Sequence, residues 1–285
     1  MLLLIISSVA LALAGPAISD GVRPPQSPSV ASAAAYSASQ AVVDTRAERE
    51  LLTLANRVRA RIELPPLRMD SGLTQAAREH AKLMAARGQL AHQFSGEPGL
   101  SQRLAASSAL YLDQAAENAA SADSPDRAHA SLMNSAAHRE NLLHPSYNVV
   151  GIGAVRLGST LFVVQDFGHS LPVYSAQQAE QLVARRLNAL RSDTNLPALQ
   201  RRESGSAQSE ACSMGKQDVL RAAGSPRLSP GRYVVRYTTM QPQALPSTAA
   251  KPITDRKVQA YSVGACFARS SRYPNGVYWM MLVFY

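Results

Sequence analysis

The sequence has few cysteines and, after its first residues, no long apolar run. Only two of its 285 residues are cysteine, so at most one intrachain disulfide can form. Beyond the N-terminus no apolar run approaches the ~20 residues that a membrane-spanning helix needs. No histidine follows His169, so a catalytic cysteine would lack a nearby base in the sequence. The chain also contains no H-E-x-x-H pair and no G-x-S-x-G segment, and so lacks these local signatures of zinc proteases and α/β-hydrolases.

The chain begins with a short apolar segment. Residues 2–14 are apolar or small, which is too short to span a bilayer comfortably, and they end in an A-x-A cleavage pattern. We therefore expect a secretory signal peptide over residues 1–17, cleaved after Ala14 or Ala17, with an uncleaved anchor as the alternative. Residues 18–47 are rich in Ser, Ala, Pro and Gln and predict a flexible linker. We expect a secreted or periplasmic protein with no transmembrane span after cleavage.

The two cysteines, Cys212 and Cys266, both lie in the last third of the chain. An exported protein meets an oxidising environment, so we expect a disulfide between them. Two buried free thiols are the alternative.

The net charge of +9 comes entirely from the second part of the chain. Residues 1–170 hold 14 Lys and Arg against 14 Asp and Glu, whereas residues 171–285 hold 15 against 6. In an exported protein this excess favours an anionic partner of the cell envelope, a lipid, a glycan or a protein, and not nucleic acid. A basic surface kept for solubility is the alternative.

Residue periodicity predicts helices followed by strands. Apolar residues at helical spacing indicate a helix over 46–62, a second from Asp70 or Ser71 to Gly88, and a third that opens at Ser124. His80 lies on the apolar face of the second helix, which favours a core histidine over a ligand. The period then changes to two, and residues 149–155 and 161–167 predict a hairpin. This order predicts an α+β layered domain.

The second part of the chain repeats features of the first. Residues 56–67 and 188–199 both follow N-x-x-R-x-x-x-x-L-P-x-L, and the terminal segment 278–284 is similar to 161–167. We interpret this as an internal duplication of one module, shortened in the second copy. Chance recurrence of a helix that ends in Leu-Pro is the alternative.

The first part resembles the CAP superfamily, which includes cysteine-rich secretory and plant pathogenesis-related proteins, and above all its small bacterial branch. The resemblance covers residues 48–169 and rests on LANRVRARIELPPL, AAREHAKLMAARGQLAH, AEN, NSAAHRENLL with VVGIGAV, and VVQDF. It implies an α-β-α sandwich with a central antiparallel sheet. We therefore expect a CAP-like domain over 48–170 and a shortened CAP-like repeat over 175–285.

The resemblance also implies a cavity lined by two histidines and two acidic residues. Carried over by motif, its members are His92, Glu117 and His138, while the fourth position, near Asn134, is not acidic. Two imidazoles and one carboxylate could hold Zn²⁺ or another divalent cation and leave a position open for water. The alternative for Glu117 and Asn118 is a structural role, in which they hold a loop by hydrogen bonds to backbone amides.

The family resemblance implies no general enzymatic activity. We therefore expect an exported binding or interaction protein, and not an enzyme, with a lipid, glycan or protein of the envelope as its partner. The second hypothesis is a metal-dependent hydrolase that acts on an envelope polymer or peptide. A third is a structural pair in which the second module occludes the first.

Overall fold

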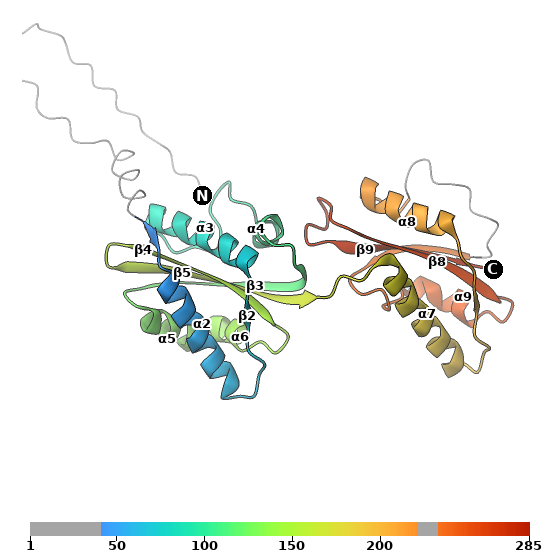
Figure 1. The fold of residues 1–285 in the computed structure, drawn as a ribbon, viewed down its shortest axis with the longest axis horizontal. Helices are drawn as coiled ribbons and strands as arrows, with labels where there is room; N and C mark the ends of the chain where they lie inside the picture. Colours follow the sequence, from blue (N-terminus) through green and yellow to red (C-terminus); the bar gives the residue numbers. More distant parts are fainter. Residues whose placement is uncertain (1–40, 222–232) are drawn as a thin grey trace, which may run out of the picture.

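The structure is a computed structural model that describes residues 41–221 and 233–285 (Figure 1). The signal peptide expected over 1–17, and the linker up to residue 40, lie outside the described residues. The last part of that linker is folded, because β1 (Val42–Val43) pairs with a central strand and Asp44 caps the first helix. This strand was not predicted, because two residues carry no period. Within the described ranges, no helix has the length and apolar character needed to cross a membrane.

The first module, β1 to β5, is a mixed, mainly antiparallel sheet with helices on both faces. The sheet runs β1-β4-β5-β3, and β2 (Arg68–Met69) adds a short parallel pairing to β4. Its long strands are β3 (Tyr111–Ala122), β4 (Val149–Leu157) and β5 (Thr160–Leu171). The expected hairpin is β4–β5, and it turns at Gly158, whose φ of 59° suits glycine.

Alternation along β4 directs its side chains to two cores. Val150, Ile152 and Ala154 pack with α2 (Thr45–Ala60), α5 (Pro125–Asn134) and α6 (Ala136–Leu142), whereas Val155 packs with α3 (Ser71–Arg87). Successive strand residues point to opposite faces, so this pattern produces a helix–sheet–helix sandwich. The expected α-β-α fold class is confirmed.

Local signals place the helix ends where the sequence predicts them. Asp70 caps α3 by accepting the Leu73 amide at 2.9 Å, and Gly88 ends it with a left-handed φ of 58°. Ser124 caps α5, which has proline in its first turn. The short helix α4 (Leu100–Ser107) was not predicted, because eight residues give no clear period. The A-E-N motif, for which a role in holding a loop was considered, lies within β3.

In the second module, α7 to β9, the strands pair in the same order as β2, β4, β5 and β3 of the first module. Its sheet runs β6-β8-β9-β7, built from β6 (Gln200–Arg201), β7 (Tyr233–Thr239), β8 (Ala260–Ala268) and β9 (Val277–Phe284). One face packs on α8 (Gly205–Gln217), and the other packs on α7 (Ala176–Asp193) and α9 (Ala250–Thr254), the latter preceded by the short helix η1 (Ser247–Ala249). Trp279 is fully buried in this core.

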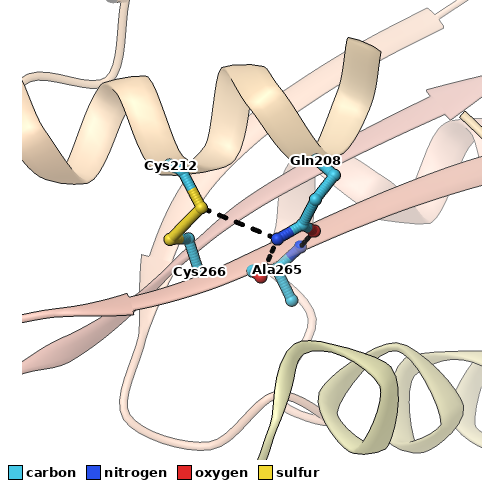
Figure 2. Close-up of a disulfide and its surroundings, with 4 residues drawn as sticks. All are labelled: Gln208, Cys212, Ala265 and Cys266. Carbon is cyan, nitrogen blue, oxygen red and sulfur yellow. Dashed lines mark hydrogen bonds between the residues drawn. A yellow bond between two sulfur atoms is a disulfide. The ribbon is translucent and has the colours of Figure 1, made fainter. Parts of the chain in front are cut away.

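The expected disulfide is confirmed. Cys212 of α8 is bonded to Cys266 of β8, with their Cα atoms 5.0 Å apart (Figure 2). One turn earlier on α8, Gln208 forms two hydrogen bonds of 2.9 Å with the backbone N–H and C=O of Ala265. The helix α8 is therefore fixed to β8 by the disulfide and by the Gln208 side chain. This side-chain amide bonds to the backbone of β8 as a neighbouring strand would.

Two side chains fasten the modules to each other. The Tyr111 hydroxyl donates to the Met240 carbonyl at 2.6 Å, and the Tyr111 ring lies in the core of the second module. The Arg269 guanidinium donates to the carbonyls of Ala105, Ser108 and Leu110 at 3.0–3.1 Å. These carbonyls lie at and after the end of α4, so the loop that follows β8 is held against the first module.

Candidate functional site

His92 and Glu117 are in direct contact. Glu117 lies in β3, His92 lies in the loop after α3, and His92 Nδ1 is 2.9 Å from Glu117 Oε1. An ionised carboxylate only accepts hydrogen bonds, so Nδ1 carries the proton and Nε2 is left for another partner. The His92 side chain is 60% exposed whereas that of Glu117 is 4% exposed. The pair is therefore an exposed imidazole oriented by a buried carboxylate.

His138 lies beside this pair on α6. The ring centroids of His92 and His138 are 6.2 Å apart. Burial, followed by the charge of His92, lowers the pKa of His138. The Asn118 side chain donates to the His138 carbonyl at 3.0 Å, and Asn141 donates to Asn118 Oδ1 at 2.9 Å. The three residues predicted for the cavity are thus brought together, and the E-N motif positions two of them.

Arg103 of α4 neutralises the Glu117 charge. Its guanidinium forms an ion pair with Glu117 Oε2 and donates to the His92 carbonyl at 3.2 Å. Both Arg103 and Glu117 are buried, and a buried carboxylate needs such a partner to remain ionised. Arg103 therefore fixes both members of the histidine–carboxylate pair.

A second ion-pair set lies behind the first. His80, fully buried in α3 as expected, contacts Glu97 Oε1 through Nδ1 at 2.7 Å and the Ala91 carbonyl through Nε2 at 2.8 Å. Burial raises the pKa of Glu97, but hydrogen bonds from the Phe94 amide and His80, together with the charge of Arg103, bring it below its usual value. The loop that carries His92 is thus anchored from both sides.

Asp166 faces Glu117 from the neighbouring strand. The two residues are register partners in the β3–β5 ladder, and Asp166 has no exposed surface. Neither of its carboxylate oxygens has a hydrogen-bond partner among the described residues, which is the arrangement expected when two carboxyl groups meet. Burial, followed by the charge of Glu117, raises the pKa of Asp166 well above its usual value. Burial and the nearby Glu117 charge therefore favour the protonated form of Asp166.

Three residues of the site, Arg103, Glu97 and Asp166, were not predicted from the sequence. Arg103 lies on the short α4, and Glu97 lies in a loop without a period. Asp166 was assigned only to a strand, and its place opposite the A-E-N motif comes from the strand register, which no local pattern specifies.

The donor set does not fit a three-ligand metal centre in this arrangement. Glu117 already faces Arg103 and His92, one through each oxygen. Among residues 41–221 and 233–285, no three His, Cys, Asp or Glu side chains are grouped so that they could hold a metal ion. The binding of Zn²⁺ or another divalent cation at this site stays a prediction.

Comparisons with known proteins assign the first module. Residues 52–167 match the sequence profile described as CAP, Cysteine-rich secretory protein family. Uncharacterized protein YkwD of Bacillus subtilis (strain 168) is 31% identical over 113 residues, which cover 39% of this chain and 44% of YkwD.

Two solved structures are also similar to part of this chain. An extracellular protein containing an SCP domain from Bacillus anthracis str. Ames is 26% identical over 44% of this chain and 41% of its own, with a TM-score of 0.41. An outer surface protein from Borrelia burgdorferi is 22% identical over 45% of this chain and 96% of its own, with a TM-score of 0.42. The chain thus spans less than half of YkwD and of the Bacillus anthracis protein. Residues 52–167 of this chain thus form a domain that matches the CAP, Cysteine-rich secretory protein family.

Proposed function

We propose that this chain is an exported binding protein that recognises an envelope lipid, glycan or protein. The observation that carries the proposal is the exposed His92 ring held by a buried ion pair of Glu117 and Arg103. Such a site is rigid before its ligand arrives, which lowers the entropic cost of binding. Because Glu117 is engaged with Arg103, it is better suited to orient His92 than to activate water.

A basic face on the second module supports an anionic partner. Arg185 and Arg186 on α7 are exposed, as are Lys251, Arg256 and Lys257 at and after α9. Within the described ranges none of these five forms an ion pair with an acidic side chain, whereas Arg201 pairs with Glu180. Unpaired surface cations attract an anionic surface over about one Debye length, roughly 10 Å at 0.1 M salt.

The same proposal includes an internal duplication. Arg59 in the first module donates to the carbonyls of Pro65, Leu142, His144 and Tyr147. Arg191, 132 positions later, donates to those of Pro197, Ile253, Asp255 and Val258. Each arginine is the last residue of the N-x-x-R segment that the two modules share, and both side chains are fully buried. Two copies of one ancestral module account for both the shared sequence pattern and the matching strand order.

Sedimentation with a purified cell-envelope fraction tests the proposed binding. We expect the protein to co-sediment, and the bound fraction to fall when Arg185 and Arg186 are both replaced by Glu. The matched control reverses Arg46 and Arg49, which are exposed on α2 of the first module. Binding that is equally reduced by both pairs, or by neither, would exclude the basic face as the contact.

The rival hydrolase hypothesis predicts a different result. It requires release of a product from envelope polymer, and loss of that release in Glu117→Gln with the fold unchanged. The binding proposal predicts co-sedimentation without any released product.

A further inference from the structure

We propose that the second module positions the His92 site of the first module by fixing the connection between α4 and β3. The Arg103–Glu117 ion pair joins these two elements, because Arg103 lies in α4 and Glu117 lies in β3. Residues 108–110 alone separate the end of α4 from the start of β3. Contacts that fix this short connection therefore also set where Arg103 lies relative to Glu117.

Arg269 of the second module holds the α4 side of the connection (Figure 1). Its guanidinium donates to the carbonyls of Ala105 at 3.1 Å, Ser108 at 3.1 Å and Leu110 at 3.0 Å. The last carbonyls of a helix carry partial negative charge, so a cation that bonds to them stabilises the helix end. Arg269 is exposed to solvent, but three hydrogen bonds from one planar group fix the direction in which the chain leaves α4.

Tyr111 holds the β3 side of the connection. It is the first residue of β3, and its buried ring packs edge-on against Phe267 and Tyr278 in the core of the second module. Its hydroxyl donates to the Met240 carbonyl at 2.6 Å. Glu117 lies further along the same strand, so the strand that carries Glu117 is anchored in the second module where it begins.

The loop that presents Arg269 is itself shaped by the second module. The Asp218 carboxylate, at the C-terminal end of α8, accepts hydrogen bonds from the hydroxyl of Ser270 at 2.9 Å, the hydroxyl of Ser271 at 3.2 Å and the backbone N–H of Arg272 at 3.2 Å. These three residues directly follow Arg269. A guanidinium on an unsupported loop would move with α4, whereas one on a supported loop can hold α4 in place.

The histidine site is sensitive to small movements of α4. An isolated helix of eight residues is marginal in water, so α4 relies on its neighbours. Within the first module, Leu104 packs in a buried cluster with α3, and Ser108 Oγ donates to Asp70 Oδ1 at 3.0 Å. The bond from Arg103 to the His92 carbonyl measures 3.2 Å, the long end of the usual range, so a displacement of α4 by roughly 1 Å would break it.

The position of the proton on His92 reports the state of the site without any ligand. Glu117 accepts the Nδ1 proton in the intact site, whereas an unconstrained neutral imidazole carries its proton mainly on Nε2. Proton–nitrogen NMR of the full chain with isotope-labelled histidine distinguishes the two forms at about pH 8, where an ordinary histidine is neutral. The His92 signal is identified by its absence in His92→Gln, and the parent unfolded in urea gives the signal of unconstrained rings.

We expect the parent to show His92 in the Nδ1–H form, and Arg269→Ala to move its signal at least halfway toward that of the unfolded chain. Tyr111→Phe keeps the ring but removes the bond to Met240, and should move the signal in the same direction. Arg272→Ala is the matched control from the same loop and should leave the signal unchanged, because its guanidinium forms no hydrogen bond to the first module in the part of the chain that the structure describes. Thermal melting confirms that each variant is folded.

The proposal is overturned if neither Arg269→Ala nor Tyr111→Phe moves the His92 signal, if Arg272→Ala moves it equally, or if the parent lacks the Nδ1–H form. The positioning role rests on the proposed function only for what the site binds. Because the NMR measurement needs no ligand, failure to co-sediment with cell envelope would remove the binding function and leave the positioning role standing.

Discussion

At the residue scale, the His92 site depends on two buried carboxyl groups, those of Glu117 and Asp166. Glu117 faces a cation, Arg103, on one side and a second carboxyl group, Asp166, on the other. Two ionised carboxylates at these positions would repel each other, and burial together with the charge of Glu117 raises the pKa of Asp166, which favours its neutral form. The His92 Nδ1 atom lies 2.9 Å from the other carboxyl group, that of Glu117.

The substitution Asp166→Asn tests this protonation state. The folded-state pKa of Asp166 is raised above its ordinary value of 3.8, so its contribution to stability is fully present below pH 3.8 and is lost as pH rises toward the folded pKa. Asn mimics the neutral acid and does not titrate. We expect parent and variant to unfold with similar free energies near pH 4, and the variant to gain up to about 1.4 kcal/mol per pH unit above it.

Urea denaturation at several pH values measures the difference. If the parent instead gains stability over the variant as pH rises, Asp166 is ionised in the folded protein and the charge assignment at Glu117 is wrong.

The sequence identified the two histidines and the glutamate grouped at this site but not the residues behind them. His92, Glu117 and His138 each lie in a recognisable motif. Asp166 meets Glu117 only through the register of β3 against β5, which pairs residues 49 positions apart, and no local pattern specifies that pairing. Arg103 reaches the site from an eight-residue helix that is too short for a reliable period.

At the element scale, glycines let a helix approach a strand closely in both modules. A Cβ built on Gly151 of β4 would lie 2.0 Å from the Leu73 carbonyl carbon in α3, and one on Gly264 of β8 would lie 2.2 Å from the Ala207 oxygen in α8. Val-Gly pairs at both positions were visible in the sequence, but their cause was not. The glycines permit backbone contact that any side chain would block.

Replacement of either glycine by Ala should therefore destabilise the protein. The obstructing atoms belong to helix backbone and cannot rotate away, so α3 or α8 must shift, at a cost of about 1–3 kcal/mol or more. Gly99→Ala is the control, because a Cβ there meets nothing within 4 Å. Thermal melting compares the three variants, and equal midpoints for Gly151→Ala and Gly99→Ala would refute the packing argument.

The disulfide has its effect at the same scale, because it closes a loop with a sequence separation of 54 between α8 and β8. Loop-closure entropy for that length corresponds to about 4 kcal/mol. The double variant Cys212→Ser with Cys266→Ser should lose roughly this amount in urea denaturation under oxidising conditions. The parent treated with reductant provides the comparison, and a loss confined to one of the two samples would contradict the assignment.

At the scale of the whole molecule, the two modules share a boundary with few but specific contacts. Tyr111 belongs to a strand of the first sheet yet packs in the core of the second, against Phe267 and Tyr278. Arg269 of the second module in turn donates hydrogen bonds to backbone carbonyls of the first. The sequence pattern predicted two related modules, but it could not predict how they dock, because these contacts join segments about 130 to 170 positions apart.

The substitution Arg269→Ala should uncouple the modules. The change removes three hydrogen bonds that the charged guanidinium donates. Each such bond contributes at most about 1.5–3 kcal/mol to stability. We expect scanning calorimetry to show one transition for the parent and two for the variant. Arg272→Ala is the control from the same loop, since its guanidinium makes no hydrogen bond to the first module among the described residues. A single transition in both variants would contradict the predicted coupling.

Under the proposed function, His92, Glu117 and His138 form a binding site that works without a metal ion. The most direct test is the fraction of protein that co-sediments with cell envelope after treatment with a chelator, for the parent and for the double variant His92→Ala with His138→Ala. We predict that the chelated parent remains bound and that the double variant loses binding. Equal retention of the two proteins, or loss of binding by the chelated parent, would contradict the claim.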